Sequence, residues 1–147
     1  MEEIYTAIMA RLKETVPELN WIDIDEGQLE YYAERPSVAF PCALIDIAVT
    51  QCEDLYERAQ LCRATIGIRV VQNIPTSRTN SVATEPVRTN ALERYQLVEK
   101  VFESLQSWGG SGFNPLSRMS QKKESRKDFL FVVRIDFATQ FKQIIGN

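Results

Sequence analysis

The feature that most constrains the fold is a strict alternation of apolar and polar residues near the middle of the chain. Between residues 62 and 71, every second position is apolar, and these positions are Cys62, Ala64, Ile66, Ile68 and Val70. Successive side chains of a strand point to opposite faces, so this pattern predicts a strand with one core face and one polar face. Residues 129–138 repeat the pattern with aromatic and β-branched residues, which favour strands. We place Phe129 and Phe137 on the same face of that second strand.

A third segment, residues 38–49, is apolar at nearly every position. This continuity predicts a strand that is covered on both faces, or on one face by helices and on the other by a neighbouring subunit. Pro41 has no N–H to donate to a strand ladder, so we place it at the start of the strand or on an edge. Further short strands are predicted at residues 21–25 and 116–120, and turns at residues 53–58 and 121–127.

Two segments have helical periodicity instead. Residues 2–15 place apolar side chains three to four positions apart, and Pro17 ends this helix. Residues 91–107 form the second predicted helix, with Asn90 as its N-cap and Glu93 as the reciprocal capping residue.

A polar segment separates the third strand from the second helix. Residues 73–90 contain two prolines and many Ser, Thr and Asn residues, with little apolar pattern. They predict a long loop, and loops of more than ~12–15 residues are usually functional or disordered. Residues 141–147 are expected to form a short flexible C-terminal tail.

The order of the elements predicts the fold class. The 147 residues suit one domain, spanning 1–147. Consecutive strands without helices between them pair directly, unlike those of doubly wound folds. We therefore predict an α+β two-layer domain in the order α-β-β-β-α-β-β. Its mixed, mainly antiparallel sheet has four to five strands, with two helices packed on it.

The inventory of reactive residues predicts a protein without catalysis, cofactor or metal. The chain has no histidine, the commonest general acid or base and a frequent metal ligand. Three cysteines ten residues apart are predicted to be buried small hydrophobes rather than zinc ligands, and their odd number cannot complete an intrachain disulfide framework. Acidic clusters could bind magnesium in a metal-assisted enzyme, although a solvated strand face explains them equally well. They comprise Asp23, Asp25 and Glu26, and Asp46, Glu53 and Asp54.

The basic residues define a candidate interface. The net charge of −3 provides no general attraction for nucleic acid, so any contact with phosphates requires a local patch. For the basic run at residues 122–127, a solvated or protein-facing role is favoured over phosphate binding, because no aromatic residues for base stacking lie within the run. A small nucleic-acid-binding module using residues 122–127 is the alternative. No membrane partner is expected, since the longest apolar stretch is shorter than a membrane helix. The candidate residues are Arg78, Arg88, Lys122, Lys123, Arg126 and Lys127.

The order and spacing of these segments resemble the tail terminator and tail-completion proteins of long-tailed bacteriophages and prophages. The resemblance spans nearly the whole chain, from the helix ending in Val16-Pro17 to the strand at Phe129–Phe137. It implies a non-enzymatic subunit of a ring, commonly a hexamer, that caps the tail tube and joins it to the head. Implied partners are further copies of the chain, the tail tube protein and a head-completion or connector protein, with DNA passing through the channel. The implied location is the virion, assembled in the cytoplasm of the bacterial host, and residues 73–90 are a candidate interface segment.

Overall fold

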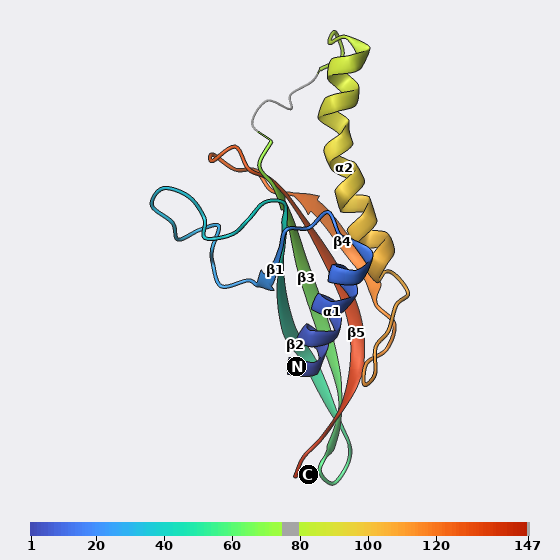
Figure 1. Cartoon of the computed structure of the whole chain (residues 1–147). Coiled ribbons are helices and arrows are strands. Elements are labelled where there is room, and N and C mark those ends of the chain that lie inside the picture. The colour runs from blue at the N-terminus through green and yellow to red at the C-terminus, as the bar shows by residue number, and fades with distance from the viewer. Residues whose placement is uncertain (75–79, 147) are drawn as a thin grey trace.

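The computed structural model describes residues 1–74 and 80–146, and it contains two helices and a five-stranded sheet in the predicted order (Figure 1). The α+β prediction is therefore confirmed. The elements are α1 (Glu2–Thr15), β1 (Trp21–Ile24), β2 (Cys42–Tyr56), β3 (Ala59–Gln72), α2 (Glu85–Leu105), β4 (Ser117–Lys123) and β5 (Phe131–Ile144).

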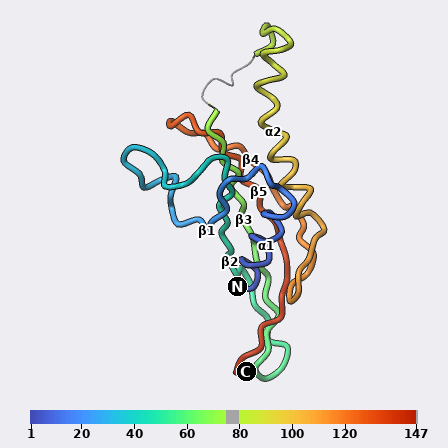
Figure 2. The backbone as a smooth tube through the Cα atoms, in the orientation of Figure 1, coloured from blue at the N-terminus to red at the C-terminus, as the bar shows by residue number. Residues whose placement is uncertain are grey.

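The sheet is mixed and mainly antiparallel, as predicted. Its strand order is β1-β2-β3-β5-β4, and only β1 and β2 run parallel to each other. Figures 1 and 2 show β2, β3 and β5 continuing together past helix α1, so that their ends project from the body of the protein. The C-terminus lies at this projecting end.

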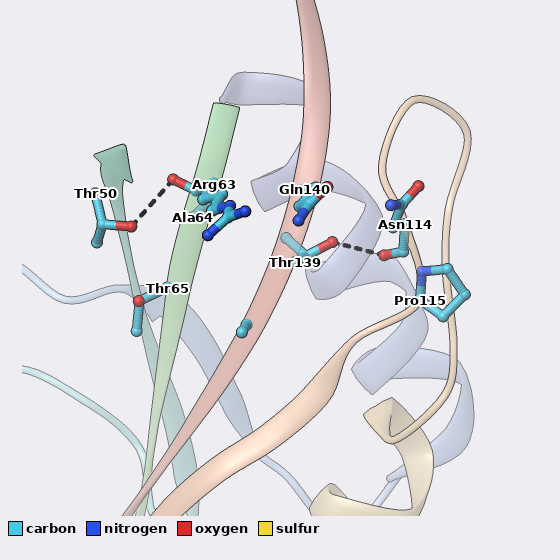
Figure 3. A pocket seen from close by; sticks show the side chains of 9 residues that line it. Thr50, Arg63, Ala64, Thr65, Asn114, Pro115, Thr139 and Gln140 are labelled. Carbon is cyan, nitrogen blue, oxygen red and sulfur yellow. Dashed lines mark hydrogen bonds between the residues drawn. The ribbon is translucent and has the colours of Figure 1, made fainter. Parts of the chain in front are cut away.

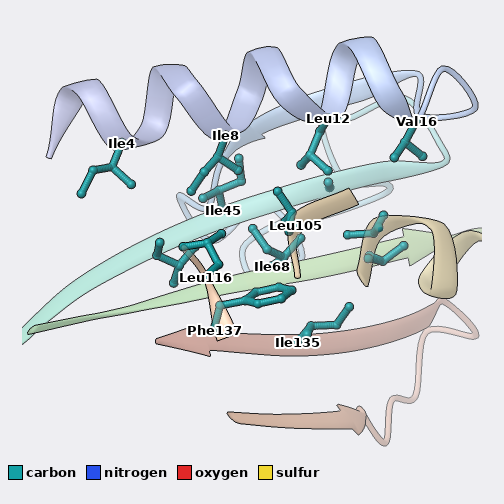
Figure 4. Close-up of a cluster of buried hydrophobic side chains, with 14 of the residues drawn as sticks. Ile4, Ile8, Leu12, Val16, Ile45, Ile68, Leu105, Leu116, Ile135 and Phe137 are labelled. Carbon is teal, nitrogen blue, oxygen red and sulfur yellow. The ribbon is translucent and has the colours of Figure 1, made fainter. Parts of the chain in front are cut away.

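One face of the sheet holds the main core. Figure 4 shows Ile4, Ile8 and Leu12 of α1 lying over strand residues that include Ile68 and Phe137. All five side chains are buried, and the C-terminal half of α2 adds further residues to the cluster. The helical spacing of the first segment thus placed its apolar face correctly.

The opposite face carries a smaller cluster, which corrects the predicted polar face of β3. The connection between β1 and β2 supplies Leu29 and Val38, which pack against the starts of β2 and β5 and the end of β3. Arg69 and Val71, on the face of β3 expected to be polar, are consequently buried. The apolar start of β2 is covered on both faces as predicted, and here the second cover is the chain's own segment.

Helix α2 begins earlier than predicted. Its first residue is Glu85 and its N-cap is Thr84, so Asn90 lies inside the helix and the predicted loop of residues 73–90 is too long. The predicted loop includes Pro86, yet a proline in the first helical turn loses no intrahelical hydrogen bond. The helix ends at Leu105, two residues before the predicted end.

The strands also differ from the predictions at their ends. β2 begins at Cys42 and continues through the predicted charged turn to Tyr56, because its residues pair with β3 almost to the hairpin tip. β5 runs to Ile144, where a flexible tail was expected, because Ile144 pairs with Ala59. β4 extends to Lys123, into the predicted basic turn. Backbone pairing with an adjacent strand decided all three ends.

The three cysteines do not share one environment. Cys42 and Cys62 are buried, as predicted, in the small and the main cluster respectively. Cys52 is exposed, which is a correction, because the projecting part of β2 has no helix over it.

Candidate assembly surfaces

A charged network is buried beneath the connection between β1 and β2, with Arg69 of β3 at its centre. Only 5% of Arg69 is exposed. Its guanidinium donates to both carboxylate oxygens of Glu124, at 2.9 and 2.7 Å, and to Asp25 at 3.3 Å. Glu30 lies 2.6 Å from the same group. Burial disfavours the charge of Arg69, but the hydrogen bonds and charges of Glu124 and Glu30 outweigh that effect and raise the pKa of Arg69.

Arg126 extends the network from the turn between β4 and β5. It donates to the two carboxylate oxygens of Asp128 at 2.9 and 2.6 Å, to Glu124 at 3.2 Å and to the carbonyl of Leu29 at 2.7 Å. The Tyr32 hydroxyl donates to Asp128 at 2.7 Å. These bonds tie the connection between β1 and β2 to the turn between β4 and β5. Arg126 is predicted to be an interface residue, but the N–H groups of its guanidinium donate to other groups of the same chain.

Acid should loosen this network through Asp128. Hydrogen bonds from Arg126 and Tyr32 outweigh burial and hold the pKa of Asp128 well below its usual range. A carboxyl with a lowered folded-state pKa stabilises the fold above its unfolded pKa of about 4, and that contribution is lost as the pH falls toward the folded value. We therefore expect Asp128→Asn to lower stability at pH 7 and to flatten the loss of stability below about pH 5.

Urea unfolding from pH 7 to pH 3 measures this effect. Asp54→Asn, on the exposed part of β2, is the matched control and should keep the wild-type slope. Parallel curves for Asp128→Asn and the wild type would contradict the expected contribution of Asp128.

The predicted interface residues do not form one patch. Lys122 and Lys123 are exposed on β4, and Lys127 is exposed in the following turn. Arg88 is exposed near the start of α2, away from β4 (Figure 1). Arg78 lies outside the described residues. Lysines on an edge strand also have a purely structural use, because they discourage unwanted strand pairing.

In each acidic cluster of the sequence, one aspartate forms an ion pair with an arginine. Asp25 pairs with Arg69, and Asp46 receives two hydrogen bonds from Arg134 at 3.0 and 2.9 Å. Gly67 lies between β2 and β5 at this point, and a Cβ there would collide with the Arg134 guanidinium. Among the described residues, no group of three or more metal-ligating side chains is placed to hold an ion.

A shallow depression of about 450 Å³ lies where β2, β3 and β5 meet the loop before β4 (Figure 3). Two of its hydroxyls are engaged with backbone carbonyls: Thr139 donates to Asn114 at 2.6 Å, and Thr50 donates to Arg63 at 3.3 Å. Its lining contains no carboxylate or thiol, and consists of Thr50, Arg63, Ala64, Thr65, Asn114, Pro115, Ala138, Thr139 and Gln140.

Exposed apolar side chains gather at the projecting end of the sheet. We call this end the arm and define it as residues 49–61 of the β2–β3 hairpin with residues 141–146. Register brings the hairpin tip beside the end of β5, since Ala59 pairs with Ile144 and Ile145 bonds to the Arg58 carbonyl. Exposed apolar patches commonly mark protein interfaces. The large exposed apolar residues of the arm are Val49, Leu55, Tyr56, Ile144 and Ile145.

A second exposed apolar region lies at the start of α2. The first turns of this helix extend beyond the sheet (Figure 1). Val82, Val87 and Leu92 are exposed there, with Val82 at 89%. The sequence predicts a loop at residues 73–90 and a charged turn at residues 53–58, and neither prediction indicates an exposed apolar surface. For the arm, the local signal in the sequence is the isolated pairs Leu55-Tyr56 and Ile144-Ile145.

β2 also has an open edge. β1 pairs only with Cys42–Ile45, and the N–H of Ile47 donates to the Tyr5 hydroxyl at 3.1 Å. The remainder of β2 forms an edge of the sheet that continues into the arm. Neither described helix combines the length and apolar character needed to cross a bilayer.

Comparison with known proteins gives a likeness in fold. No protein-family model matches the sequence, and no curated protein matches it. Among solved structures, the chain is similar to one in a structure entitled "Virion of native gene transfer agent (GTA) particle", with a TM-score of 0.54 and 9% sequence identity. The alignment covers 94% of this chain and 93% of the other. The two chains therefore share a fold over almost their entire lengths.

Proposed function

We propose that this chain is a non-enzymatic structural subunit of a phage-like virion. The observation that carries the proposal is the likeness in fold to a chain of the gene transfer agent virion, which extends over 94% of this chain. The resemblance in element order to phage tail proteins supports the same class. The exposed apolar regions of the arm and of α2 suit a chain whose partners are other proteins.

Within that class, we propose a subunit of the ring that terminates the tail tube and joins it to the head. A closed ring requires two different, complementary surfaces on each subunit. The arm and the start of α2 are two exposed apolar surfaces at opposite ends of the molecule (Figure 1). The open edge of β2 is a further surface that a neighbour would protect.

The proposed partners follow from that position. The chain would associate with itself, in a hexameric ring, and contact the tail tube protein on one side and a connector or head-completion protein on the other. DNA would pass through the channel. The ring would belong to the virion and assemble in the bacterial cytoplasm.

The test is assembly in the presence of tail tubes from the same genome. Light scattering and electron microscopy should show rings of this chain, free or at the ends of tubes. A chain that stays monomeric at high concentration and leaves the tube ends bare would overturn the proposed ring.

A charge placed on the arm should weaken assembly. Leu55 is 46% exposed, and we expect Leu55→Asp to reduce association at least ~10-fold, because a carboxylate is costly to bury in an apolar interface. Tyr31→Asp is the matched control, since Tyr31 is 87% exposed and lies outside the arm. Thermal unfolding should be unchanged in both variants. Equal assembly by Leu55→Asp and the wild type would remove the arm from the proposed interface.

Nucleic-acid binding is the second candidate, because Lys122, Lys123 and Lys127 are exposed. Fluorescence anisotropy with duplex and single-stranded DNA at two salt concentrations tests it, since phosphate contacts weaken as salt rises. An absence of binding at low salt, or binding unchanged when all three lysines are replaced by alanine, would eliminate this role.

A further inference from the structure

Two cysteines face each other across the β2–β3 hairpin, where the arm meets the body of the sheet. Cys52 of β2 and Cys62 of β3 are directly opposite in the antiparallel ladder, and their Sγ atoms lie 3.3 Å apart. Directly opposite residues of an antiparallel pair have Cα atoms about 4.5–5.5 Å apart. Disulfides join Cα atoms about 4.4–6.8 Å apart. The ladder therefore holds this pair at a separation that a disulfide can bridge without moving the strands.

The two thiols differ in their access to solvent. Cys52 is exposed, whereas Cys62 is 3% exposed and packs in the main core cluster. Burial, together with the hydrogen bond from Cys52, raises the pKa of Cys62. Cys42, the third cysteine, is fully buried, and burial raises its pKa to about 12. A small reagent in solution would thus meet Cys52 first, with Cys62 directly behind it.

We propose that Cys52 and Cys62 form a reversible redox site, which closes to a disulfide on contact with a low-molecular-weight disulfide such as oxidised glutathione. The Cys52 thiolate attacks one sulfur of the reagent, forming a mixed disulfide and releasing one small thiolate. The Cys62 thiolate then attacks the Sγ of Cys52, forming the bond between the strands and releasing the second small thiolate. The two cysteine protons pass through solvent to the released thiolates. The pair is oxidised by two electrons, and the reagent is reduced.

This disulfide would covalently link the two strands of the hairpin that forms most of the arm. The crosslink joins β2 to β3 near the hairpin tip, and therefore limits separation of β3 from β2, the strand that carries Val49, Leu55 and Tyr56. It closes a short loop, which restricts the unfolded chain as well. The site depends only on the register of β2 and β3, so it does not require the proposed role in a virion.

The experiment counts thiols in the full chain after incubation with oxidised glutathione. We expect the three free thiols to fall to one, and the mass to fall by about 2 Da with no glutathione retained. Peptide mapping should join Cys52 to Cys62. Hydrogen exchange of residues 49–61 should slow, and dithiothreitol should reverse each change.

Three single variants separate the steps. Cys42→Ser should form the same crosslink and retain no free thiol. Cys62→Ser should stop at a stable mixed disulfide on Cys52. Cys52→Ser changes an exposed side chain and should retain both of its thiols over the same incubation. The proposal is overturned if the wild type keeps three thiols, stops at the mixed disulfide, or joins Cys52 between two chains instead.

Discussion

Arg69→Met is expected to lower the free energy of unfolding by about 3 kcal/mol. The substitution leaves Asp25 without its arginine partner, and it removes one of the two arginines that contact Glu124 and Glu30. The Asp25 and Glu124 side chains are only 12% and 26% exposed, so water replaces the Arg69 cation poorly. Glu30 is 41% exposed and contributes less, because solvent screens its charge. The loss therefore falls at the lower end of the range for broken buried ion pairs.

Arg63→Met is the matched control for this prediction. Arg63 lies on the same face of β3, six residues before Arg69, but its side chain is exposed. Surface substitutions of this kind usually change stability by less than about 0.5 kcal/mol. Urea unfolding of both variants at pH 7 gives the comparison. Similar midpoints for the two variants would mean that the network is not held in the arrangement described.

Phe137→Ala is expected to lower the free energy of unfolding by about 3–5 kcal/mol. Phe137 is fully buried, and it packs in the main cluster beneath α1 (Figure 4). Its removal loses the transfer free energy of a large ring and leaves a cavity that the surrounding strands cannot close, because β5 is paired on both sides.

Phe129→Ala tests whether the loss reflects burial rather than residue type. The alternation in the sequence places Phe129 and Phe137 on one strand face, but β5 begins at Phe131 and Phe129 is 66% exposed. We expect little change in its unfolding midpoint. If the two variants lost equal stability, the predicted single face from 129 to 137 would be right and the described start of β5 wrong.

The helices and strands were predictable where a short stretch of sequence spaced its apolar residues as a helix or a strand requires. Ile4, Ile8 and Leu12 lie four residues apart, and all three are buried in the core. The start of α2 was missed because Pro86 and the polar residues around it suit a loop and a first helical turn equally well. Residues 53–56 were missed as a strand because they are exposed, and therefore show no apolar alternation.

The candidate surfaces were less predictable than the fold. Lys122, Lys123 and Lys127 are exposed, but Arg126 is bound by Asp128, Glu124 and the Leu29 carbonyl. Glu124 and Asp128 lie only two residues away on either side of Arg126. The Leu29 carbonyl comes from the connection between β1 and β2, which folds back over the turn that carries Arg126.

The sequence by itself determined the period of each main element, and so which residues of α1, β3 and β5 face the core. Period is a local property, set by the direction in which successive side chains leave the backbone. Only the tertiary structure decided which residues contact each other. Arg69 meets carboxylates 44 and 55 residues away, and Cys52 meets Cys62 through the register of β2 and β3. Such contacts depend on how distant segments align, which the local pattern of apolar residues does not record.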